Sequence, residues 1–122
     1  MICDYDFFRL MYQTSLRQTA RTGIPYQLAL ITLEGKEESV SHRSLETALD
    51  QLLAVLRTGL RAGDVVTRYS FRQIILLLPN TSAEDAGRVC ERLYSSFRRL
   101  HSHAPVRLLY EITSRRLGDC NP

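Results

Sequence analysis

Short β-rich segments alternate with long amphipathic segments in this chain, and this alternation predicts an α+β fold. The order from residue 26 onward is strand, helix, two strands joined by a tight turn, helix and strand. That β-α-β-β-α-β order is typical of ferredoxin-like domains, in which two helices cover an antiparallel sheet. We therefore expect one domain over residues 1–122, with an N-terminal helix at 4–22, a ferredoxin-like core at 26–112 and a loose tail at 113–122.

The N-terminal helix is predicted from its two ends. Asp4 or Asp6 lies near the start, where a carboxylate caps free N–H groups, and Gly23 supplies a C-terminal stop. The following segment 26–33, YQLALITL, is short and apolar, as expected for a buried central strand. The polar, glycine-containing stretch 34–41 is expected to form a loop.

The clearest periodic element is a leucine-rich helix over residues 44–61. Its leucines recur at three- and four-residue spacings and mark one buried face: Leu45, Leu49, Leu52, Leu53, Leu56 and Leu60. Gly63 is expected to end this helix. A hairpin follows, in which two apolar runs at 64–69 and 73–78 flank a tight connection at 70–72.

The start of the second helix of the core is predicted from the stretch Thr81–Asp85. Its hydroxyls accept the free N–H groups of a first helical turn, and its carboxylates favour that end of a helix. The helix is expected to continue to about residue 100 and to bury one face: Ala83, Ala86, Val89, Cys90, Leu93, Phe97 and Leu100. The final strand, 106–112, alternates apolar and polar side chains.

Composition excludes several classes of function. No apolar run approaches the roughly 20 residues of a membrane helix, and the N-terminus has no secretion-signal pattern, so we expect a cytoplasmic protein. The net charge of +3 is spread along the chain, so direct DNA contact is not expected. Cys3, Cys90 and Cys120 show no C-x-x-C spacing, which argues against a zinc site or a disulfide framework.

The hairpin segment Arg61–Pro79 reads RAGDVVTRYSFRQIILLLP. It resembles the GGDEF domain of diguanylate cyclases, whose pattern in this region is R-x-x-D-x-x-x-R-Y-G-G-D/E-E-F-x-x-L-L-P. The alignment needs no gap, and the resemblance extends from about Tyr5 to Ile112. It implies the same nucleotide-cyclase-like fold. Five other residues stand at the signature positions: Ser70, Phe71, Arg72, Gln73 and Ile74.

The resemblance implies that the chemistry of the family is missing. Active members hold a divalent metal with an aspartate on the first strand and an acidic signature residue; here Thr32 and Arg72 stand at these positions. Phe71 replaces a glycine that lets the backbone approach phosphate. The family's guanine-contacting Asn and Asp are absent from residues 35–45. We therefore expect no enzymatic activity, no bound metal and no cofactor.

One family motif is retained. Arg61 and Asp64 match the R-x-x-D motif of the family's inhibitory site, which binds cyclic di-GMP, and Arg92 stands where the family often supplies a second arginine. Two arginines and a carboxylate suit a guanine edge and phosphates. The alternative is structural: Arg61 closes the leucine-rich helix and pairs with Asp64 at the start of the next strand. The sequence leaves both interpretations open.

The whole chain also resembles the C-terminal part of SARP-like bacterial transcriptional regulators, which carry a winged-helix DNA-binding domain and a bacterial transcriptional activator domain. The shared features are C-x-Y-x-F-F near the N-terminus, LALITL, and RYS-x-x-Q-x-I-LLLP. This resemblance implies a degenerate GGDEF-like interaction module, with DNA contact made by other domains. The first helix is rich in large apolar side chains: Tyr5, Phe7, Phe8, Met11 and Tyr12. Core packing accounts for some of them, and the sequence leaves open whether the others contact a partner domain or a second copy of the chain.

Overall fold

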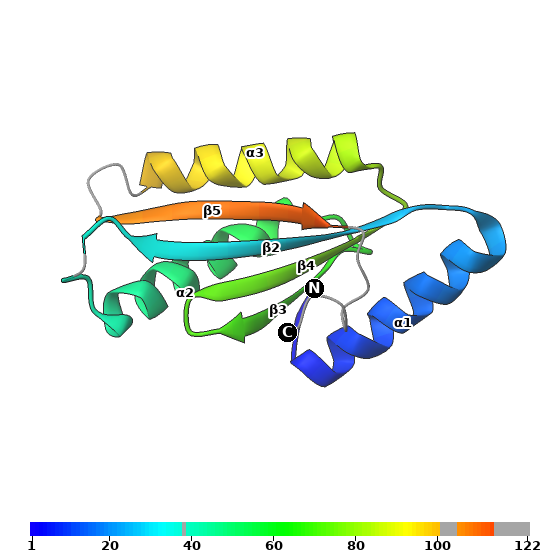
Figure 1. The fold of residues 1–122 in the computed structure, drawn as a ribbon, viewed down its shortest axis with the longest axis horizontal. Helices are drawn as coiled ribbons and strands as arrows, with labels where there is room; N and C mark the ends of the chain where they lie inside the picture. The colour runs from blue at the N-terminus through cyan, green and yellow to red at the C-terminus, as the bar shows by residue number, and fades with distance from the viewer. Residues whose placement is uncertain (38, 101–104, 114–122) are drawn as a thin grey trace.

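The computed structural model describes residues 1–37, 39–100 and 105–113, and these have an α+β fold (Figure 1). The predicted fold class is confirmed. The elements in chain order are β1 (Ile2–Cys3), α1 (Tyr5–Thr22), β2 (Tyr26–Gly35), α2 (His42–Gly59), β3 (Val65–Ser70), β4 (Gln73–Pro79), α3 (Ala83–Leu100) and β5 (Val106–Thr113).

The five strands form one sheet in the order β1-β3-β4-β2-β5. The four strands of the predicted core pair with one another in antiparallel fashion. Strand β1 was not predicted, and it pairs in parallel with β3 through Ile2↔Val66 and Cys3↔Thr67. Two residues are too few to show an alternating pattern, so the sequence does not reveal this strand. It forms because the neighbouring edge of β3 offers it hydrogen bonds.

Helices cover both faces of the sheet (Figure 1). Helices α2 and α3 pack on one face, where their apolar stripes meet Ala29, Ile31 and Leu33 of β2. Helix α1 packs on the opposite face, where Phe8 and Tyr12 form a smaller cluster with four sheet residues: Leu28, Val65, Ile75 and Leu77. The strand side chains alternate between these two cores, as the pleat requires.

Both predicted ends of α1 are confirmed. The Asp4 carboxylate accepts a hydrogen bond from the Phe7 N–H at 2.8 Å. Gly23 adopts φ +74°, a left-handed conformation that suits glycine, and its N–H donates to the Thr19 carbonyl at 2.8 Å. Phe7 and Leu10 lie on the outer side of the helix and are 40% and 60% exposed.

Helix α2 begins and ends two residues earlier than predicted. Ser41 caps its start by accepting a hydrogen bond from the Ser44 N–H at 3.1 Å. Gly63 does not end the helix. Leu60 already has extended backbone angles, because the chain enters the Arg61–Asp64 turn directly after α2. The predicted leucine face is buried from Leu45 to Leu56, whereas Leu60 is only partly buried against it.

The other predicted boundaries are close to the observed ones. Ser82 caps α3 by accepting from the Asp85 N–H at 3.1 Å, but Ala83 and Leu100, in the first and last turns, are exposed rather than buried. Strands β2 and β5 pair from Gly35↔Val106 to Leu28↔Thr113, so each runs one or two residues further than predicted. Residues 114–122 of the predicted tail lie outside the described residues.

No helix in the described part of the chain is both long and apolar enough to cross a membrane.

Candidate functional site

The signature positions form the tip of the β3–β4 hairpin. Phe71 and Arg72 make a two-residue connection, one residue shorter than the predicted 70–72, because Ser70 is the last residue of β3. The register between the strands shifts between Arg68 and Ser70. The Leu33 N–H donates to the Arg72 carbonyl at 2.8 Å, which holds the turn against the C-terminal part of β2. The hairpin tip therefore lies beside the strand that carries Thr32.

Three neutral side chains hydrogen-bond one another at this tip. Gln73 lies directly opposite Thr32 across the β2–β4 ladder, and its Nε2 donates to Thr32 Oγ1 at 3.1 Å. Ser70 Oγ donates to Gln73 Oε1 at 3.0 Å, and the Arg72 N–H donates to Ser70 Oγ at 3.3 Å. The position at which the resembling family has a metal-binding aspartate is thus occupied by a hydroxyl that pairs with an amide.

Phe71 covers the same tip with an aromatic ring. It packs against the core on the α2/α3 face and stacks on His42 of the first turn of α2, with ring centroids 4.1 Å apart and planes 23° apart. No group of three or more His, Cys, Asp or Glu in residues 1–37, 39–100 and 105–113 is placed to hold a metal ion. Glu34, two residues beyond Thr32, lies 3.9 Å from Arg107 Nε.

The R-x-x-D residues contact each other directly. The Asp64 carboxylate, whose side chain is only 3% exposed, accepts hydrogen bonds from the Arg61 backbone N–H at 2.9 Å, from Nε at 3.4 Å and from Nη2 at 3.1 Å. The Asp64 N–H returns a bond to the Arg61 carbonyl at 3.0 Å. The pair therefore closes the turn between α2 and β3, as the structural interpretation predicts.

Arg61 also connects this turn to the end of β4. Its Nη2 donates to the Pro79 carbonyl at 3.1 Å and to Thr81 Oγ1 at 2.6 Å. The Arg61 side chain is nevertheless 58% exposed. Arg92 of α3 lines a shallow cleft of about 140 Å³ together with Leu60, the residue before Arg61. The third predicted ligand residue is therefore placed at the same end of α2 as the other two.

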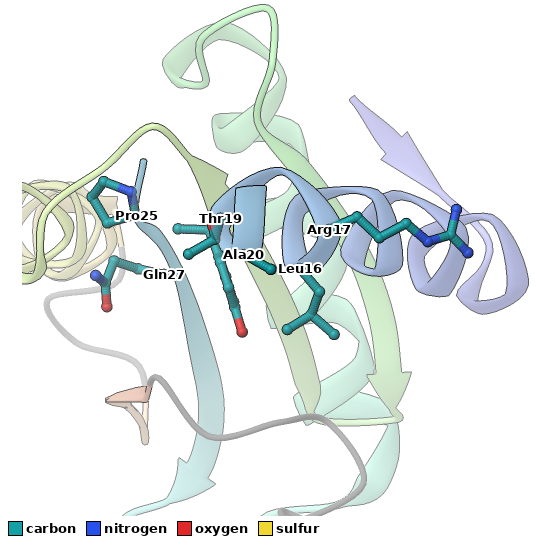
Figure 2. Close-up of a pocket in the computed structure, with 7 residues that line it drawn as sticks. Leu16, Arg17, Thr19, Ala20, Pro25 and Gln27 are labelled. Atoms are coloured by element: carbon teal, nitrogen blue, oxygen red, sulfur yellow. The ribbon is translucent and has the colours of Figure 1, made fainter. Parts of the chain in front are cut away.

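A larger pocket lies on the α1 face, far from these residues in sequence (Figure 2). It has a volume of about 630 Å³ and is formed by the C-terminal part of α1 and the start of β2, including Leu16, Ala20, Pro25 and Tyr26. Figure 2 shows the Arg17 guanidinium pointing away from Pro25 and Gln27. The pocket is mainly apolar and offers no pair of groups for acid–base chemistry.

Two cysteine thiols have a raised pKa, and this makes both of them less reactive. Burial, with a smaller contribution from Glu91, raises the pKa of the Cys90 thiol to about 11. Burial also raises the pKa of Cys3, aided by the neighbouring Asp4 carboxylate. The thiolate is the nucleophilic form of cysteine, so a raised pKa disfavours nucleophilic catalysis.

Two contacts of the site were not foreseen from the sequence. The sequence predicts that the Thr81 hydroxyl belongs to the helix cap. In the structure Ser82 makes the cap, and Thr81 Oγ1 accepts a hydrogen bond from Arg61. His42 stacks on Phe71, which lies 29 positions later in the sequence (71 − 42), so no local pattern predicts this contact.

No protein-family model matches this sequence, and no curated protein matches it significantly. Similarity appears in solved structures. The active GGEEF domain of a diguanylate cyclase from Vibrio cholerae matches with a TM-score of 0.80 at 16% identity, over 98% of this chain and 80% of that one. The chain has the fold of GGDEF domains.

Two further structures support the same fold. The GGDEF domain of YfiN from Pseudomonas aeruginosa gives a TM-score of 0.75 at 23% identity, over 90% of this chain and 74% of that one. The GGDEF domain of DgcB from Caulobacter crescentus, solved in complex with c-di-GMP, gives 0.76 at 11% identity, over 96% of this chain and 75% of that one. At these identities the likeness establishes the fold, and function has to be argued from the site.

Proposed function

We propose that this domain is a catalytically inactive GGDEF-like module, and that it acts through protein contacts within a bacterial transcriptional regulator. The observation that carries the proposal is the hydrogen-bonded set of Thr32, Ser70 and Gln73 at the hairpin tip. A cyclase needs divalent cations to neutralise triphosphates, and hard cations need carboxylate oxygens. Neutral groups that already satisfy one another are poor ligands for such an ion.

Phe71 supports the same proposal. In the resembling family a glycine at this position lets the backbone come close to phosphate. Here the ring of Phe71 stacks on His42 and packs on the core, so it fills space at the turn. Loss of the carboxylates and filling of the turn are independent changes, and each one opposes nucleotide chemistry.

Helix α1 supports the protein-contact role. Phe7 and Leu10 are large apolar side chains that are 40% and 60% exposed, and the mainly apolar pocket of Figure 2 lies on the same side of the sheet. Exposed apolar surface of this kind commonly marks a contact with another domain. The remaining aromatic residues of α1 pack against the sheet, so they need no partner.

Incubation with GTP and Mg²⁺ tests the absence of catalysis. The purified domain is expected to form no cyclic di-GMP, measured by chromatography against an active GGEEF domain as the positive control. Any product that depends on this protein would overturn the proposal. A Gln73→Ala variant is a matched control, because a true active site at the hairpin tip would lose its product when this residue is changed.

The transcriptional role is tested in the full-length protein. A winged-helix domain upstream of this segment is the expected arrangement, and reporter transcription should respond to a Phe7→Ser, Leu10→Ser double variant that still folds. If this variant leaves reporter transcription unchanged, the exposed surface of α1 has no part in the regulation.

The alternative function is a receptor for cyclic di-GMP. It is favoured by the exposed Arg61 side chain and by Arg92 beside Leu60, whereas the bonds of Arg61 to Asp64, Pro79 and Thr81 favour the structural role. Calorimetry with cyclic di-GMP separates the two. Heat that disappears in both Arg61→Ala and Arg92→Ala supports the receptor, and no heat at high micromolar ligand removes it.

A further inference from the structure

The outward side of helix α1 carries five residues with the spacing of a coiled-coil seam. They are spaced by three, four, three and four residues, and we refer to them as the outer stripe: Phe7, Leu10, Thr14, Arg17 and Arg21. This spacing keeps side chains on one side of a helix, where a second helix can pack against them. All five residues are exposed, and Figure 1 shows no other helix alongside α1 in the described part of the chain. The outer stripe is therefore open to contact by a further helix.

The two halves of the outer stripe differ in chemistry. Phe7 and Leu10, near the start of α1, are large apolar side chains that are 40% and 60% exposed. Arg17 and Arg21, nearer its end, are cations, and neither forms an ion pair with another described residue. Figure 2 shows the Arg17 guanidinium pointing away from the other labelled residues. A helix packed along the outer stripe would thus meet apolar side chains at one end and cations at the other.

A second copy of α1 does not match this distribution of charge. A parallel copy would place Arg17 and Arg21 opposite themselves, and like charges repel. An antiparallel copy of full overlap would place Phe7 opposite Arg21 and Leu10 opposite Arg17. A shifted antiparallel copy would overlap only at Phe7 and Leu10, whereas a stable interface buries roughly 800 Å² per partner. The outer stripe therefore favours a different helix over its own copy.

We propose that an acidic amphipathic helix of a partner domain packs along the outer stripe, antiparallel to α1. Acidic residues in its first half lie beside Arg17 and Arg21, and apolar residues in its second half cover Phe7 and Leu10. The antiparallel direction is chosen because carboxylates stabilise the N-terminal end of the helix that carries them. The proposal rests on the proposed contact through α1 and deepens it, since it names the conformation and the charge of the partner segment.

Binding of a designed peptide tests this pairing. The probe is a capped helix of about 18 residues, long enough to be helical in water, with Glu, Glu, Ala, Leu and Leu at its seam positions and alanine and glutamine elsewhere. In NMR spectra it is expected to shift the amides of the outer stripe and to leave those of α3 unchanged. Serine in place of both leucines should weaken binding at least roughly tenfold. A peptide with the reverse order should bind more weakly, and tighter binding by it would contradict the antiparallel direction.

Charge variants test the acidic preference. Arg17→Glu is expected to weaken binding roughly fivefold, as for an exposed ion pair, and a peptide with lysines in place of glutamates should recover the loss. Arg17 lies before the last turn of α1, so its reversal does not disturb the charge at the helix end. Arg9→Glu is the matched control, because Arg9 is an exposed arginine of α1 outside the outer stripe, and this variant should bind like the wild type. Normal NMR spectra of each variant show that it folds.

Three results would overturn the proposal. One is unchanged amide shifts along the outer stripe with millimolar peptide, and another is equal affinity of the unmodified domain for the glutamate and lysine peptides. The third is binding to phosphatidylcholine and phosphatidylserine vesicles that is lost in Leu10→Ser, because that would assign the outer stripe to a membrane surface.

Failure of this proposal is distinguishable from failure of the proposed function. If the Phe7→Ser, Leu10→Ser variant alters reporter transcription but the acidic peptide does not bind, the contact through α1 stands and only the chemistry of the partner is wrong. The assay with GTP and Mg²⁺ is independent of both results.

Discussion

The hairpin tip and the Arg61–Asp64 turn are both places where the resembling family binds nucleotides. In this protein the polar side chains of each region hydrogen-bond one another. The two regions differ in which residue types make these bonds. At the tip the residue types have changed, and Thr32, Ser70 and Gln73 bond one another in place of carboxylates. At the turn the residue types are retained, and Arg61 and Asp64 bond each other.

This difference teaches that a retained motif and a lost motif carry different information. At the tip, Thr32 and Arg72 stand where the resembling family has carboxylates, and this is the basis of the proposed inactivity. Retention at the turn is equally well explained by a fold that needs a buried carboxylate to close the junction between α2 and β3. The free energy of unfolding of variants in each region therefore tests whether its side chains are retained for stability.

The largest expected effect is that of Asp64→Ala. The carboxylate is buried and accepts three hydrogen bonds from Arg61, so its removal leaves the Arg61 backbone N–H without a partner and the guanidinium without its counter-charge. We expect a loss of about 3 kcal/mol in the free energy of unfolding, measured by urea denaturation.

Arg61→Ala is the matched control for the turn. The Arg61 side chain is more than half exposed, so its own removal is expected to cost about 1 kcal/mol, part of it from the carboxylate left behind. If both substitutions cost less than about 0.5 kcal/mol, the turn is not held by this pair. The motif would then have to be explained by a ligand.

The next effect is that of Phe71→Ala, expected to cost about 1–2 kcal/mol because the ring is only partly buried but stacks on His42. Thermal and urea unfolding measure it. A double-mutant cycle with His42→Ala should give a coupling of roughly 0.5–1 kcal/mol for the ring pair. A coupling of zero would show that Phe71 packs on the core alone, without help from His42.

The sequence predicted the framework of both regions better than their contacts. Hydrophobic periodicity located the leucine face of α2 and the two strands of the hairpin, because burial imposes a period on the chain. Local chemistry located two helix starts, at Asp4 or Asp6 and within Thr81–Asp85, and in the structure Asp4 and Ser82 are the capping residues. The sequence did not reveal strand β1, which depends on the edge of β3. Nor did it reveal the contact of Thr81 with Arg61, since it joins residues 20 positions apart.

A smaller effect is expected at the centre of the tip. Gln73→Ala removes the amide that joins Thr32 to Ser70, and both hydroxyls can turn to water because all three groups are only partly buried. The expected cost is about 1 kcal/mol in urea denaturation. Thr32→Val, which keeps the size of the side chain, should cost a similar amount. A loss above about 3 kcal/mol in either variant would show that the tip, and not the turn, is the more strongly coupled region.

The smallest expected effect is that of Mg²⁺ on the unmodified protein. The tip offers a hydroxyl at Thr32 and a cation at Arg72, so 10 mM Mg²⁺, about the upper range of such assays, should leave the melting temperature unchanged. A Thr32→Asp, Arg72→Glu double variant restores two carboxylates and should gain roughly 1 kcal/mol of stability at saturating ion. Its melting temperature in the absence of the ion provides the reference. Stabilisation of the unmodified protein by the same amount would mean that other groups hold the metal, and the contrast between a substituted tip and a retained turn would fail.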